Sequence, residues 1–132
     1  MSVDDAEPHW ENGYAFSQLL LAEREHQAAT NEREEAEYAL IEAARLGRDA
    51  EHQASMRKAQ IASNPPGKNA EERAAATLIL LEGDEEYSRL SSEARDFRAT
   101  QAEIKPKIKT LEADMRRIEL HMIGLTNIMR SP

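Results

Sequence analysis

The sequence contains no cysteine, few aromatic residues and no long apolar run. Without cysteine the chain has no disulfide, no thiolate metal ligand and no cysteine nucleophile. The longest apolar run, residues 78–81, is too short to span a bilayer, and the acidic start of the chain lacks the apolar core of a signal peptide. We therefore expect a soluble cytoplasmic protein that does not bind membranes.

Alanine, glutamate, lysine, leucine and arginine make up about half of the 132 residues, while aromatic residues account for 5%. This composition is typical of long helices and coiled coils, and it excludes a β-sandwich or a β-barrel. The net charge of −8 lies entirely in residues 1–50, because residues 51–132 hold equal numbers of acidic and basic side chains. An acidic half and a neutral half favour packing against each other over binding to duplex DNA.

Residues 63–69, with the sequence SNPPGKN, predict a break between two helices, because adjacent prolines and a glycine end helices. Asn69 and Glu72 then have the spacing of a capping box, which predicts a new helix at once. The all-α fold that we expect is a long antiparallel helical hairpin. It has an N-terminal arm (residues 1–13) and one hairpin domain (residues 14–130), made of a helix over 14–62, the loop over 63–69 and a helix over 70–130.

Both predicted helices carry a coiled-coil seam, which is a set of positions at alternating steps of four and three residues. The second helix has mostly large apolar residues at these positions, with Gln101 the one polar member: Ala76, Leu80, Gly83, Tyr87, Leu90, Ala94, Phe97, Gln101, Ile104, Ile108, Leu111, Met115, Ile118, Met122, Leu125 and Met129. The first helix has mostly small ones: Leu19, Ala22, His26, Ala29, Arg33, Ala36, Leu40, Ala43, Gly47, Ala50, Ala54, Arg57 and Ile61. Gly83 and Asp84 offer an alternative local break, because Asp84 can cap a helix that restarts at Glu85, and Pro106 should bend the helix. Since the second seam stays in phase across Gly83 and Pro106, we favour a second helix that continues through both.

With the loop centred near residue 66, the numbers of facing residues should sum to about 132. This register places Arg33 opposite Gln101, two polar residues on otherwise apolar seams. We expect them to form a polar layer that fixes the register, with Glu37 or Glu103 neutralising Arg33.

At the open end of the hairpin, where the chain begins and the second helix finishes, apolar residues extend beyond the seam. The N-terminal arm can fold back over this end, but we favour a homodimer in a four-helix arrangement built on it. The expected interface with a second copy or another protein comprises Trp10, Tyr14, Phe16, Leu20, Ile118, Leu120, Met122, Ile123, Leu125, Ile128 and Met129.

The sequence offers little for catalysis, and we expect no enzyme. Glu23 and His26 have the Glu-x-x-His spacing of di-metal bundles, but the chain has no second such motif, so we expect no metal and no cofactor. Nucleic-acid binding is a less favoured alternative, supported by a basic concentration at Arg95, Arg98, Lys105, Lys107, Lys109, Arg116 and Arg117. An inhibitor or nucleic-acid mimic that presents the acidic residues 32–37 is another.

The segments GKNAEER at residues 67–73 and EGDEEY at residues 82–87, followed by a long heptad helix, resemble small coiled-coil accessory proteins of bacteriophages and prophages. The resemblance covers residues 30–130 and implies an accessory protein that binds another macromolecule in the host cytoplasm. It assigns no catalytic residue. Our leading interpretation is a non-catalytic coiled-coil interaction protein, and an accessory role in recombination or replication through the basic stretch is the alternative.

Overall fold

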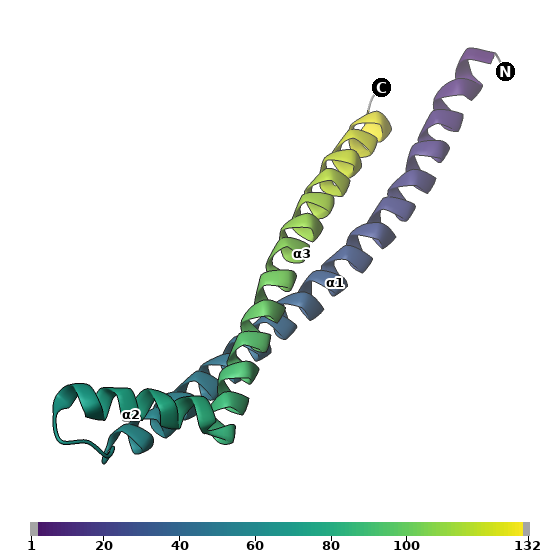
Figure 1. The fold of residues 1–132 in the computed structure, drawn as a ribbon. Helices are drawn as coiled ribbons and strands as arrows, with labels where there is room; N and C mark the ends of the chain where they lie inside the picture. Colours follow the sequence, from purple (N-terminus) through teal and green to yellow (C-terminus); the bar gives the residue numbers. More distant parts are fainter. Residues whose placement is uncertain (1–2, 131–132) are drawn as a thin grey trace. The chain divides into compact units, whose positions relative to one another are not determined.

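The structure is a computed structural model that describes residues 3–130, with side chains described from residue 12 onward. It contains three α-helices in that range, which are α1 (Val3–Ala62), α2 (Ala70–Gly83) and α3 (Glu85–Arg130), and no strand is assigned to the described residues (Figure 1). The all-α class is confirmed, and the two long helices pack against each other. The expected arm over residues 1–13 is wrong from residue 3 onward, because α1 begins at Val3 rather than near residue 14.

The residues divide by their mutual contacts into two units. The central unit is Ala39–Ile104, and the terminal unit joins Met1–Tyr38 with Lys105–Pro132. In the terminal unit the first part of α1 and the last part of α3 run antiparallel, so that the open end lies where α1 begins and α3 finishes (Figure 1). The central unit contains the rest of both helices, the connection at residues 63–69 and α2.

The predicted seam of the first helix is confirmed at every position. Each of its thirteen members is buried or half-buried, and alanines are among the most enclosed, with Ala22 4% and Ala43 5% exposed. Alanine suits this face because a small side chain lets the other helix approach closely. The large residues on α3, such as Leu90 and Leu111, fill the space that these small residues leave.

The cap of α2 is the one that the sequence predicts. Asn69 Oδ1 accepts a hydrogen bond of 2.9 Å from Glu72 N, and Glu72 Oε2 accepts one of 2.8 Å from Lys68 N. The second bond reaches one residue further back than a capping box requires. Gly67 has a φ of +147°, and a Cβ there would lie 2.8 Å from Arg73 N, so only glycine fits this turn.

The predicted continuity at Gly83 is wrong. Helix α2 ends at Gly83, and Asp84 caps α3 by accepting a hydrogen bond of 2.8 Å from Tyr87 N. Across the break the buried face shifts by one residue, because Leu81 is buried whereas Leu80 is 45% exposed. The second seam is therefore confirmed at Ala76 and from Tyr87 to Met129, but not at Leu80 and Gly83.

Arg57 of α1 holds this break in place from across the central unit. Its guanidinium donates to both oxygens of Asp84, at 3.0 Å from Nε and 2.7 Å from Nη2. The hydrogen bonds from Arg57 and from Tyr87 N stabilise the charged carboxylate, which lowers the pKa of Asp84 to about 2. A polar pair thus decides where α3 starts.

Pro106 does not interrupt α3, as expected. Its ring removes the amide hydrogen that would bond to the carbonyl of Ala102, yet helical residues continue on both sides. The seam neighbours Ile104 and Ile108 both remain half-buried. The helix and its half-buried face are therefore continuous through Pro106.

The register differs from the expected one. In the terminal unit, His26 faces Glu119 and Arg33 faces Glu112, and both pairs of numbers sum to 145 rather than about 132. In the central unit, Glu51 binds Arg98. The cause lies in the connection, which is extended rather than tight, and an extended chain advances about 3.3 Å per residue against 1.5 Å in a helix. Residues 63–69 therefore place the first residue of α2 beyond the end of α1, and α2 then runs back toward α1.

Candidate interaction surface

The terminal unit places a seam of α1 against a seam of α3, with polar contacts along its edges. His26 Nε2 and Glu119 Oε1 are 2.9 Å apart, and Arg33 Nε lies 3.0 Å from Glu37 Oε1 and 3.6 Å from Glu112 Oε1. These pairs are partly exposed, so each contributes about 1 kcal/mol or less to stability. They fix the register more than they hold the helices together.

The predicted polar layer of Arg33 with Gln101 is wrong, because each residue has other neighbours. Arg33 binds Glu37, as expected, together with Glu112. Gln101 lies in the central unit beside Gly47, where a Cβ on the glycine would stand 3.4 Å from Gln101 Nε2. The shift in register explains the change of partners.

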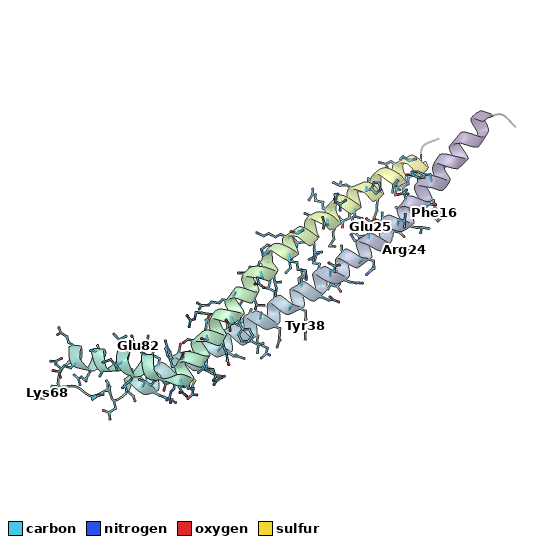
Figure 2. All side chains as sticks on the ribbon, turned by 45° about the vertical axis from the view of Figure 1, so that its right-hand side comes forward. Phe16, Arg24, Glu25, Tyr38, Lys68 and Glu82 are labelled. Carbon is cyan, nitrogen blue, oxygen red and sulfur yellow. The ribbon has the colours of Figure 1, made fainter. Side chains whose placement is uncertain are left out.

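Large apolar side chains remain exposed at the open end. On α1, Phe16 is 51% and Leu20 is 43% exposed, and on α3, Leu120 is 61% and Ile123 is 56% exposed. Figure 2 shows Phe16 on α1 close to the last turns of α3. We call these four residues, together with the groove described next, the open-end surface. Exposed apolar side chains that gather in this way are typical of protein-binding surfaces.

A groove of about 560 Å³ runs between α1 and α3 at this end. Three apolar residues, Leu19, Met122 and Ile123, line the groove together with five polar ones, which are Glu23, Glu119, Thr126, Asn127 and Arg130. Protein interfaces combine the two kinds of residue, because apolar atoms supply affinity and charged groups select the partner. The groove is open along its length and therefore suits a helix or a side-chain row.

The structure separates the predicted interface residues into three groups. Tyr14, Phe16, Leu20, Leu120, Ile123 and Ile128 are exposed, as the prediction requires. Ile118 and Leu125 are buried between α1 and α3, and Met122 and Met129 are half-buried there. Ile118, Leu125 and Met129 therefore act in the seam, whereas Met122 lies in the seam and also lines the groove. The side chain of Trp10 lies outside the described residues.

The predicted basic stretch is divided among several settings. Arg98 binds Glu51, and Arg95 Nε donates to the carbonyl of Ser91, both in the central unit. In the terminal unit, Arg117 lies 3.7 Å from Asp114. Lys105, Lys107, Lys109 and Arg116 are exposed on α3. The carboxylates beside these cations give the surface mixed charge rather than one basic track.

Glu23 and His26 do not gather further metal ligands around them. His26 instead contacts Glu119, and nowhere among the described side chains do three histidines or carboxylates come close enough to hold an ion. None of the described helices combines the length and apolarity needed to cross a bilayer.

The sequence reasoning missed the exposed apolar residues of α2. Leu78 is 62% and Ile79 is 70% exposed, although the heptad pattern singled out only their neighbour Leu80. The signal was the run of four apolar residues at 78–81, which is longer than one seam can bury. The break at Asp84 leaves this helix with one buried position and an apolar outer side.

Comparison with known proteins gives no match to any family model, any curated protein or any solved structure.

Proposed function

We propose that this chain is a non-catalytic helical interaction protein that binds protein through the open-end surface. The observation that carries the proposal is the groove whose apolar lining is Leu19, Met122 and Ile123, together with the exposure of Phe16, Leu20 and Leu120 on the same two helices. Burying the exposed part of each such side chain stabilises a complex by roughly 1 kcal/mol, so a partner that covers them all gains enough to offset part of the cost of association. The resemblance of residues 30–130 to phage proteins supports an accessory role in the host cytoplasm.

The partner that we propose first is a second copy of the chain. Two helices from that copy, laid on the α1 and α3 pair of the terminal unit, make a four-helix arrangement in which the apolar groove becomes a core. Such an arrangement also supports the alanine-rich α1 seam, which buries little apolar area by itself. The proposal therefore accounts for both the exposed groove and the thin packing.

The test compares the mass in solution of the full chain with that of two variants, measured by light scattering. Ile123→Glu places a charge in the groove, and we expect it to shift the protein from dimer to monomer. Ile41→Glu is the matched control, because Ile41 is 66% exposed and belongs to the central unit. A wild-type monomer, or an equal effect of both substitutions, contradicts self-association through the open end.

A second measurement uses the one tryptophan of the chain. If Trp10 belongs to the interface, its fluorescence emission should move to shorter wavelength as the concentration rises through the dissociation constant. Emission that does not change while the mass doubles assigns the interface to the other residues of the open-end surface.

A further inference from the structure

Helix α2 has an outer face of its own, formed by Ala75, Leu78 and Ile79. All three residues are exposed, and Leu78 and Ile79 are among the most exposed large apolar residues of the described chain. Leu81 on the inner side is buried, so α2 cannot rotate to bury Leu78 and Ile79 without exposing Leu81. The outer face of α2 is therefore apolar and uncovered within one copy.

Carboxylates border this face at both ends. Glu71, Ala75, Leu78 and Glu82 are spaced by four, three and four residues, so they form one stripe along the helix. Glu71 and Glu82 are exposed and form no salt bridge with any described residue. Figure 2 places Glu82 near the end of α2. A second α2 laid antiparallel on this stripe would put Glu71 against Glu82 of the other copy, and like charges disfavour that pairing.

The opposite charge pattern occurs on α3 in the terminal unit. Arg116, Leu120, Ile123 and Arg130 are spaced by four, three and seven residues, which also forms one stripe. Leu120 and Ile123 are exposed, and they are part of the open-end surface. Arg116 and Arg130 are exposed and, like Glu71 and Glu82, form no salt bridge with a described residue. This stripe is therefore an apolar pair between two cations.

We infer that α2 of one copy docks antiparallel on the α3 stripe of a second copy. With Leu78 and Ile79 set opposite Leu120 and Ile123, Glu82 comes level with Arg116 to within about 3 Å along the helix axis, given a rise of about 1.5 Å per residue. Glu71 comes level with Arg130 to within about 2 Å. Long side chains span both differences.

The charges also select the direction of docking. A parallel arrangement with the same apolar contacts brings Glu71 to within about 3 Å of Arg116 along the axis, but it leaves Glu82 roughly 7 to 8 Å from Arg130. Only the antiparallel arrangement brings both pairs of opposite charges level to within about 3 Å. This gives specificity in addition to the area that the apolar residues bury.

This inference rests on the proposed function and names the segment that covers the open-end surface. In the central unit α2 lies beside the end of α1, so docking brings two helices of one copy onto the two helices of another (Figure 1). The contact joins different faces of the two copies. Two copies can therefore form the contact twice, each giving its α2 to the other, or each copy can bind the next one in a larger assembly.

The test uses two full-length variants with reversed charges, Glu71→Lys with Glu82→Lys, and Arg116→Glu with Arg130→Glu. In each variant alone, α2 and the α3 stripe carry charge of the same sign, and we expect self-association at low salt to weaken by about tenfold or more. In an equimolar mixture, each α2 meets an α3 stripe of opposite sign. We expect the mixture to regain the wild-type average mass in sedimentation velocity.

Matched controls carry the same change of charge at exposed sites away from both stripes: Glu32→Lys with Glu35→Lys, and Arg24→Glu with Arg48→Glu. These pairs should keep wild-type association, and circular dichroism should show unchanged helix content in all variants. Failure of the mixture to associate overturns the docking of α2. If Ile123→Glu still abolishes the wild-type assembly in that case, the proposed function stands with a different occupant of the groove.

Discussion

Replacing Leu90 by alanine tests the packing of α1 against α3 in the central unit. Leu90 is 2% exposed, and the change removes three carbon atoms from its side chain. At about 0.8 kcal/mol per buried methylene the lost transfer free energy is about 2.4 kcal/mol. A partial cavity adds to this, although packing between only two helices lets neighbours move in. We expect the free energy of unfolding to fall by about 3 kcal/mol, near the lower end of the range for buried leucines.

Leu80→Ala is the control that makes this prediction sharp. Both leucines belong to the same heptad series in the sequence, so a continuous helix predicts similar losses for them. In the structure Leu80 follows the shifted face of α2 and is 45% exposed, which reduces its expected loss to about 1 kcal/mol. Urea unfolding followed by circular dichroism at one fixed protein concentration measures both values. Equal losses for the two variants refute the break at Asp84 and the argument built on it.

Three further predictions follow from particular contacts. Gly47→Leu should lower the free energy of unfolding by about 1–3 kcal/mol through overpacking. A Cβ added at Gly47 would lie 3.2 Å from Phe97 Cβ, so the larger leucine side chain has no room. Thermal unfolding measures the loss. The low pKa of Asp84 means that its contribution to stability is present above its ordinary value of 3.8 and disappears as the pH falls through about 2. Arg57→Gln should raise the pKa of Asp84 toward 3.8, as an NMR titration of the carboxyl carbon will show. Pro106→Ala should raise the melting temperature, because alanine restores the missing helix hydrogen bond. The gain in stability, including the better helix propensity of alanine, is at most about 3 kcal/mol. An unchanged melting temperature would mean that the helix around Pro106 already compensates for the missing hydrogen bond.

The seam of α1 and the connection at residues 63–69 could be predicted from the sequence because both depend on local chemistry. A repeat of small residues at steps of four and three defines one face of a helix wherever the helix lies. Adjacent prolines end a helix, and Asn69 can accept the hydrogen bond from Glu72 N without help from the rest of the chain. Exposure of Phe16 and Ile123 at the open end was also predictable, since those residues exceed what one seam can bury.

The register could not be predicted, because a heptad pattern fits equally well after any shift by whole heptads. The observed sum of 145 for Arg33 with Glu112 differs from the expected value by close to two heptads, so each seam still faces the other. The sequence offers a break at Asp84 as an alternative but cannot decide for it. Continuity and the break differ by one capping interaction, and the deciding partner, Arg57, is 27 residues away in the chain.

The sequence by itself determined that the chain is helical, which faces of its helices are apolar and where the first helix ends, since propensity, periodicity and capping act over a few residues. The tertiary structure decided the register, the start of α3 and the exposure of Leu78 and Ile79. These features depend on how far the extended connection carries α2 beyond α1, and on an ion pair between residues that only folding brings together.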